Sequence, residues 1–181
     1  LEEFAPNRPA TTYDQIYKDS EMWIINMETL CLDFPRVHAF HYQFISGLGW
    51  TPAKPLPSGD MKAFADGAQS GLIVMTFGSA VKQLRKDFLD KLLEAFRHLP
   101  QRVIMRHDGE APADLPSNVM ISSWVPQNDL LGHNNTRLFI THGGNNGQLE
   151  GLYHGVPMLT LPIFGDQFYN AKRALLRGHG L

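Results

Sequence analysis

A glycine-rich turn lies between two regular patterns in the second half of the chain. The apolar run 138–141 is followed by His142-Gly-Gly-Asn-Asn-Gly147 and then by a helical pattern. Glycines let the backbone adopt positive φ angles and approach a ligand closely, and the N–H groups and dipole at the start of a helix favour an anion. A diphosphate fits this chemistry, although such a turn can also serve only tight packing. The candidate diphosphate-binding residues are His142, Gly143, Gly144, Asn146 and Gly147.

Glu150 follows His142 by eight residues, on the helix that begins at this turn. A carboxylate close to phosphate is repulsive, so its position needs a reason. It suits an acceptor for the vicinal hydroxyls of a ribose, the role of an acidic residue in dinucleotide sites. The alternative is a surface glutamate that interacts with the helix dipole.

Trp124 and Gln127 follow another predicted strand, in the stretch Trp-Val-Pro-Gln. An indole held there by Pro126 suits stacking on a planar base, which contributes about 1–3 kcal/mol. Gln127 carries a donor and an acceptor, as recognition of a pyrimidine edge requires. The alternative is a tryptophan packed under a turn.

Asp166 and Gln167 stand side by side after the last predicted strand. Together they offer acceptors and a donor for the vicinal hydroxyls of a hexose. The alternative role for Asp166 is the N-cap of the final helix.

The elements that must position these residues alternate regularly from about Met61 onward. The predicted strands are 71–77, 102–106, 118–124, 137–141 and 158–163, and the predicted helices are 83–98, 145–154 and 166–177. This alternation predicts an α/β fold with a doubly wound parallel sheet and right-handed crossovers. Ligands of such sheets lie beyond the carboxyl ends of the strands.

The first part of the chain is less regular. Residues 22–27 and 38–45 are predicted as short strands, and residues 47–59, rich in glycine and proline, as a linker. The chain opens without a methionine or a signal-like segment, and it stops after a helical pattern where a further strand is expected. We therefore expect a fragment of a longer protein.

Composition limits the classes of partner. Sixteen basic and eighteen acidic residues give a net charge of -2, which offers no electrostatic support for nucleic acid as a partner. The single cysteine, Cys31, cannot form an internal disulfide. His38 and His41 have no neighbouring third ligand, so no metal site is predicted. The apolar runs are too short to span a bilayer.

Taken together, several stretches resemble the UDP-glycosyltransferases, and in particular the animal UDP-glucuronosyltransferase-like group. The resemblance covers nearly the whole chain. It rests on Trp124-Val-Pro-Gln-Asn-Asp-Leu-Leu-Gly-His133, Thr141-His-Gly-Gly-Asn-Asn-Gly147, Glu150, Tyr153-His-Gly-Val-Pro157 and Gly165-Asp-Gln167, with Phe77-Gly-Ser79, Val103-Ile-Met-Arg-His-Asp-Gly109 and Pro52-Ala-Lys-Pro-Leu-Pro57 upstream.

The resemblance implies a role for each matched residue. His142 and the turn 143–147 match the diphosphate site, assisted by Ser79 and Asn146. Trp124 and Gln127 match the uracil site, Glu150 the ribose contact, and Asp166 and Gln167 the residues that hold the sugar. Arg106 matches an arginine near the nucleotide.

The resemblance also implies a GT-B architecture, in which two Rossmann-like domains face each other and the carboxyl-terminal one binds the donor. Residues 1–56 then correspond to the tail of the amino-terminal acceptor domain and a linker, and residues 57–181 to a truncated donor domain. Transfer in the family inverts the anomeric centre, with a histidine of the acceptor domain as general base. No counterpart of that base is present, so we expect binding of a UDP-sugar without turnover.

Further expectations follow from the same resemblance. The UDP-sugar is a co-substrate, and no cofactor or metal is expected. The acceptor is a small, lipophilic molecule bound by the missing domain, and the parent protein is anchored in the endoplasmic reticulum membrane on its lumenal side. Gly165, Asn145 and Gln148 depart from the common family pattern, so glucuronic acid, glucose, galactose and N-acetylglucosamine all stay open.

Two other functions have features in common with this sequence. A nicotinamide dehydrogenase has a similar fold class, but the turn 143–147 is not GxGxxG and Glu150 comes too early for the acidic residue of that motif. A non-catalytic nucleotide-sugar-binding module derived from a transferase stays open.

Overall fold

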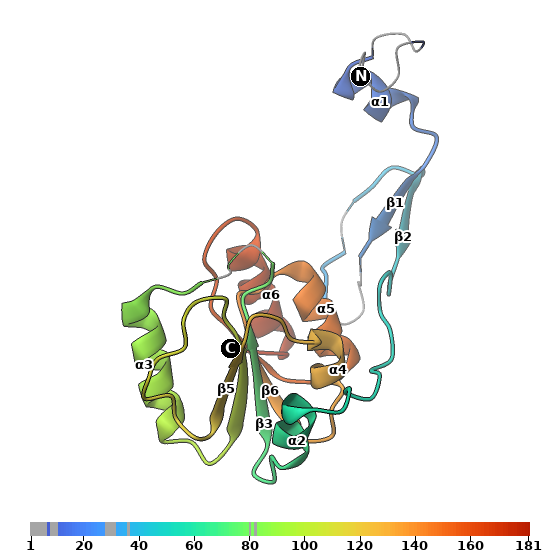
Figure 1. The fold of residues 1–181 in the computed structure, drawn as a ribbon. Coiled ribbons are helices and arrows are strands. Elements are labelled where there is room, and N and C mark those ends of the chain that lie inside the picture. Colours follow the sequence, from blue (N-terminus) through green and yellow to red (C-terminus); the bar gives the residue numbers. More distant parts are fainter. Residues whose placement is uncertain (1–6, 8–10, 28–31, 36, 80, 82) are drawn as a thin grey trace. The chain divides into compact units, whose positions relative to one another are not determined.

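The computed structural model describes residues 7, 11–27, 32–35, 37–79, 81 and 83–181 (Figure 1). The chain divides into two compact units, Leu1–Leu48 and Gly49–Leu181. Cys31 lies outside the described residues.

The smaller unit contains one helix and two paired strands. Helix α1 (Tyr13–Asp19), which the sequence did not predict, begins at Thr12, whose hydroxyl accepts a hydrogen bond from Gln15 N at 3.2 Å. Strands β1 (Trp23–Asn26) and β2 (Tyr42–Ile45) pair in parallel, within the two segments predicted as strands.

The larger unit is built around a parallel sheet (Figure 1). Its five strands lie in the order β5-β4-β3-β6-β7. The strands are β3 (Leu72–Thr76), β4 (Arg102–Arg106), β5 (Val119–Ser122), β6 (Thr136–Thr141) and β7 (Met158–Thr160). The order steps outward from β3 in both directions, as in a doubly wound sheet. The predicted fold class is confirmed.

Helices cover both faces of this sheet, because side chains of a strand alternate between its faces. Ile73 and Met75 pack in one cluster with Leu89 and Phe96 of helix α3 (Lys86–Arg97). Leu72 and Val74 face the other cluster, toward helices α2 (Asp60–Asp66) and α4 (Gln127–Leu131). Every residue of β3 is buried, as predicted for the continuous apolar run.

Two further helices follow the strands that carry the predicted site. Helix α5 (Asn145–Tyr153) follows β6, and helix α6 (Gln167–Arg177) follows β7. Both lie where the helical patterns predicted them. Strand β7 has only three residues and ends before Pro162, where the sequence predicted a longer strand.

The segment before α2 packs on the larger unit. Lys54 N donates to Asp129 Oδ1 at 2.8 Å, and Asn128 Nδ2 donates to the carbonyl of Thr51 at 3.2 Å. Leu56 is 7% exposed and belongs to the core. Residues 49–56, predicted as part of a linker, are therefore a packed element of this unit. The assignment of residues 1–56 to an acceptor domain stays a prediction.

Candidate functional site

The loops that leave the carboxyl ends of the strands carry the candidate residues. Ser79 follows β3, Arg106 ends β4, Trp124 follows β5, and His142 follows β6. Since parallel strands end at one edge of the sheet, these side chains come from neighbouring loops.

A cavity of about 290 Å³ opens at this edge. Of the predicted site residues, six line it: Ser79, Gln127, His142, Gly144, Asn146 and Gly147. Gly78, Thr141 and Asn145 line it as well and were not among the predicted site residues. Asn145 was noted in the sequence only because it is polar where smaller residues are common, which is the signal that could have identified it.

The imidazole of His142 lies between two glycines. A Cβ atom added to Gly78 would stand 2.8 Å from its Cε1 and Nε2 atoms, and one added to Gly144 would stand 2.6 Å from Nε2. Real Cβ atoms do not approach ring atoms so closely. These glycines are therefore required by the ring of His142, and Gly78 also has a φ of 68°.

Burial lowers the pKa of His142, while the carboxylate of Asp166 acts in the opposite direction. The lowered pKa keeps the imidazole neutral near pH 7, so one ring nitrogen is a donor and the other an acceptor.

Gln127 connects the loop after β5 to α5. Its Nε2 atom donates to Glu150 Oε2 at 2.6 Å, and its Oε1 atom accepts a hydrogen bond from the hydroxyl of Thr76. One end of the Gln127 amide thus binds Thr76, and the other end holds the carboxylate of Glu150. Sequence reasoning assigned these two residues to different contacts and missed their pairing.

Trp124 presents its ring to solvent, with 65% of the residue exposed. Its carbonyl accepts a hydrogen bond from Ser122 Oγ at 2.6 Å, which shapes the turn that carries the ring. The alternative of a tryptophan packed beneath the turn is therefore wrong.

Arg106 braces two of the loops. Its Nη1 atom donates to the carbonyl of Gly78 at 2.9 Å, and its Nε atom donates to the carbonyl of Ser123 at 3.0 Å. The guanidinium therefore ties the loop that packs on His142 to the loop that carries Trp124.

Asp166 and Gln167 differ in exposure. Asp166 is exposed, makes no side-chain cap hydrogen bond, and accepts a hydrogen bond from Asn170 Nδ2 at 2.8 Å. Gln167 is 3% exposed, and its Oε1 atom accepts from the backbone N–H groups of Ile163 and Phe164 at 2.8 and 3.0 Å. Gln167 therefore orders the loop before α6 with its oxygen, and its Nε2 atom has no hydrogen-bond partner among the described residues.

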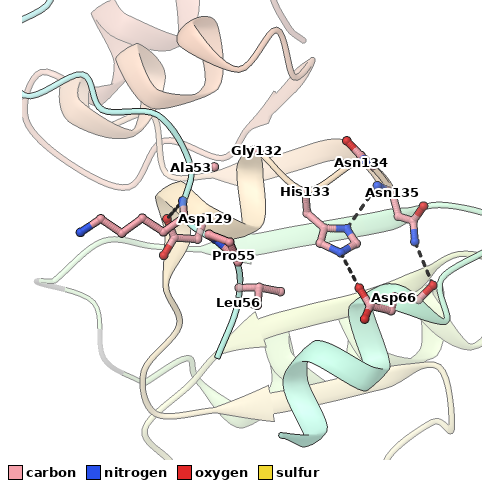
Figure 2. A pocket seen from close by; sticks show the side chains of 10 residues that line it. Ala53, Pro55, Leu56, Asp66, Asp129, Gly132, His133, Asn134 and Asn135 are labelled. Carbon is pink, nitrogen blue, oxygen red and sulfur yellow. Dashed lines mark hydrogen bonds and ion pairs between the residues drawn. The ribbon is translucent and has the colours of Figure 1, made fainter. Parts of the chain in front are cut away.

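A larger cavity, of about 380 Å³, lies near the amino-terminal ends of the strands (Figure 2). Its polar side chains pair with protein groups. His133 Nε2 and Asp66 Oδ1 are 3.0 Å apart, Asn135 Nδ2 donates to the carbonyl of Ala65 at 2.9 Å, and Asp129 accepts from Lys54 N. These pairs join α2 to the start of β6, and α4 to the segment before α2, so we assign this cavity a structural role.

The described residues include neither a membrane-spanning helix nor a cluster of metal ligands. None of their helices is long and apolar enough to cross a membrane. Among the same residues, no group of three or more histidine, cysteine, aspartate or glutamate side chains is placed to hold a metal ion.

Comparison with known proteins gives the class to which this fold and site belong. A solved structure described as the spinosyn forosaminyltransferase SpnP superposes with a TM-score of 0.72 at 23% identity, over 94% of this chain and 43% of its own. The sheet and its helices thus have the fold of the GT-B glycosyltransferases. A family profile described as "UDP-glucoronosyl and UDP-glucosyl transferase" matches residues 5–181, and the chain belongs to this family.

Curated relatives agree with this assignment and differ in the sugar that their names give. The chain is 40% identical to UDP-glucuronosyltransferase 2C1 of Oryctolagus cuniculus over 93% of its length and 33% of the relative. It is 39% identical to 2-hydroxyacylsphingosine 1-beta-galactosyltransferase of Rattus norvegicus over 96% of its length and 32% of the relative. The chain thus spans about a third of these relatives.

Proposed function

We propose that this chain is the donor-binding half of an inverting UDP-sugar-dependent glycosyltransferase. The observation that carries the proposal is the cavity at the start of α5, where His142, Gly144 and Asn146 meet Ser79. Backbone N–H groups at a helix start and a neutral imidazole suit the diphosphate of such a donor. Membership of the family supports this ligand class.

Other residues around the cavity bind the uracil, the ribose and the sugar of the donor. The exposed indole of Trp124 stacks on the uracil. Glu150, held through Oε2 by Gln127, keeps Oε1 for the ribose hydroxyls. Asp166 and the Nε2 atom of Gln167 bind hydroxyls of the sugar. Arg106 acts by keeping two loops of the site in place.

The proposed reaction also requires a general base and a site for the acceptor. We propose that the general base and the acceptor site belong to the amino-terminal domain of the parent, so the chain alone binds the donor without transferring it. General-base loss costs two to four orders of magnitude in rate. The acceptor is a small, lipophilic molecule, and the parent is anchored on the lumenal side of the endoplasmic reticulum membrane.

A binding experiment tests the donor assignment. Isothermal titration of the chain should detect UDP and UDP-sugars and give no heat with NADH, and a panel of UDP-sugars then ranks the sugar. Glu150→Ala should weaken UDP by about tenfold, the effect of a hydrogen bond to a charged group, and should weaken a uridine nucleotide without ribose hydroxyls much less.

The matched control is Glu94→Ala, which removes an exposed glutamate of α3. Equal losses for both nucleotides in Glu150→Ala would remove the ribose assignment. Failure of the wild-type chain to bind any uridine nucleotide would contradict the proposed function itself.

A further inference from the structure

The contact between α5 and α6 is polar at its centre. Gln148 is fully buried, Asn170 is 3% exposed, and Arg173 is 4% exposed. Buried polar groups cost free energy unless they are hydrogen-bonded. Apolar side chains at these positions would join two helices more simply, so the polar set calls for a functional explanation.

Arg173 determines how two amides of α5 are oriented. Its Nη2 atom donates to Asn145 Oδ1 at 2.8 Å and to Gln148 Oε1 at 2.9 Å. A guanidinium has donors and no acceptor, so an amide that faces it must present its oxygen. Gln148 Nε2 then donates to the carbonyl of Asn170 at 2.8 Å, which is consistent with this orientation.

The orientation of Asn145 leaves its amino group for another partner. Asn145 is half-buried in the first turn of α5 and lines the same cavity as His142 and Gly144. Its Nδ2 atom has no hydrogen-bond acceptor among the described residues of the chain, whereas its oxygen is held by a buried cation. The two N–H groups of this amide, at the start of a helix, favour an anionic or hydroxyl oxygen as their acceptor.

We propose that Asn145 is a further donor-binding residue and that Arg173 is the residue that positions it. With Oδ1 held by Arg173, Nδ2 donates to an oxygen of the ligand beyond the α-phosphate, on the β-phosphate or on the attached sugar. This inference rests on the proposed function, because it assigns a contact within the same site.

The same network joins the two ends of the ligand. Asn170, whose carbonyl accepts from Gln148, also donates through Nδ2 to Asp166 Oδ2 at 2.8 Å. Arg173 thereby links the helix start that binds the diphosphate to the carboxylate proposed to bind the sugar. A shift of Arg173 affects both contacts, and the uridine contacts of Trp124 and Glu150 lie outside this network.

Titration of UMP, UDP and UDP-glucose into the whole chain tests the proposal. Asn145→Ala should weaken UDP and UDP-glucose by about tenfold, as expected for one hydrogen bond to a charged acceptor, and should leave UMP within twofold. A loss with both ligands assigns the contact to the β-phosphate, and a loss with UDP-glucose alone assigns it to the sugar. No loss with either, or an equal loss with UMP, overturns the proposal.

A second set of variants tests the positioning role of Arg173. Arg173→Met should reproduce the selective loss of affinity that Asn145→Ala causes. In the Asn145→Ala background, Arg173→Met should weaken UDP binding further by less than twofold. Lys172→Met, which removes an exposed charge from the same helix, is the matched control and should change nothing. Additive losses in the double variant would show that Arg173 does not act through Asn145. If the wild-type chain binds none of UMP, UDP and UDP-glucose, the proposed function fails and this inference with it.

Discussion

The proposed donor site depends closely on His142, whose ring has a glycine on each side. Gly78 and Gly144 come from loops after different strands, and a Cβ atom on either would overlap the ring. The ring thus fits closely between the two glycines, and its Nδ1 atom also lies 3.4 Å from the hydroxyl oxygen of Thr141. The two glycines therefore leave the space that the ring of His142 occupies.

Gly144→Ala should therefore weaken UDP by about tenfold or more, because the ring must leave its place to make room. The φ of Gly144 is -61°, so alanine adds no backbone strain at this position. A double-mutant cycle with His142→Ala measures the origin of the effect. In the His142→Ala background, Gly144→Ala should reduce the affinity for UDP only slightly. A full additional loss of affinity in that background would show that Gly144 does not act through the ring of His142.

The lowered pKa of His142 predicts how donor binding depends on pH. A bound diphosphate favours the protonated ring, so binding raises this pKa and takes up a proton. Affinity for UDP-glucose, measured by titration from pH 8 downward, should increase as the pH falls through the pKa of the complex and level off below that of the free chain. His142→Gln should flatten the profile. An unchanged slope in that variant would separate the pH dependence from His142.

The same shift acts on stability with the opposite sign. The unfolded chain binds a proton at the ordinary histidine pKa of 6.5, and the folded chain only at lower pH. Folding is therefore less favourable as the pH falls from 6.5 to the folded pKa, and the effect is complete below it.

At the scale of elements, Asn118 shows how a single side chain fixes the connection from α3 to the sheet. Its Nδ2 atom lies within hydrogen-bonding distance of the carbonyls of Phe96, Leu99 and Gln101, at 2.8, 3.1 and 3.0 Å. These carbonyls belong to the end of α3 and the turn that leads into β4. One amide at the start of β5 thus satisfies the end of a helix two elements earlier.

Asn118→Ala should lower the free energy of unfolding by about 1–3 kcal/mol, the cost of leaving such carbonyls unsatisfied. Asn118→Asp should be at least as destabilising, because its oxygens face carbonyl oxygens. Urea unfolding measures both, and UDP affinity at low urea should equal that of the wild type, since Asn118 does not line the donor cavity. Wild-type stability of both variants would contradict this account.

At the scale of the whole molecule, the boundary between the two compact units can be tested by truncation. Residues 49–56 contribute the buried Leu56 and the hydrogen bonds of Lys54 and Thr51 to α4. A chain of residues 49–181 should fold and bind UDP as the full chain does, because the candidate site residues lie within it.

A chain of residues 57–181 should have a free energy of unfolding at least about 2 kcal/mol lower than that of a chain of residues 49–181. Burial of a leucine alone contributes about 1.5–3 kcal/mol, and Asp129 loses its partner as well. Thermal and urea unfolding of the two chains give the comparison. Equal stabilities would restore the boundary predicted from the sequence, after residue 56.

The sequence alone determined the architecture of the larger unit and predicted where a ligand binds. Continuous apolar runs predicted buried parallel strands, helical spacing predicted α3, α5 and α6, and the turn after His142 predicted the ligand site. These features are local, so a short window contains all the residues that produce them. Helices α2 and α4, of seven and five residues, were missed because so short a pattern carries little periodicity.

Only the tertiary structure decided which polar groups meet. Gln127 and Glu150 are 23 residues apart, and Arg173 and Asn145 are 28 apart. Each of these side chains has several possible partners in the sequence. Which of them it contacts depends on strand order and on how helices pack on the sheet, and these arise from interactions of the whole chain. Residue types therefore predicted the chemistry of the site, and the fold assigned the partners.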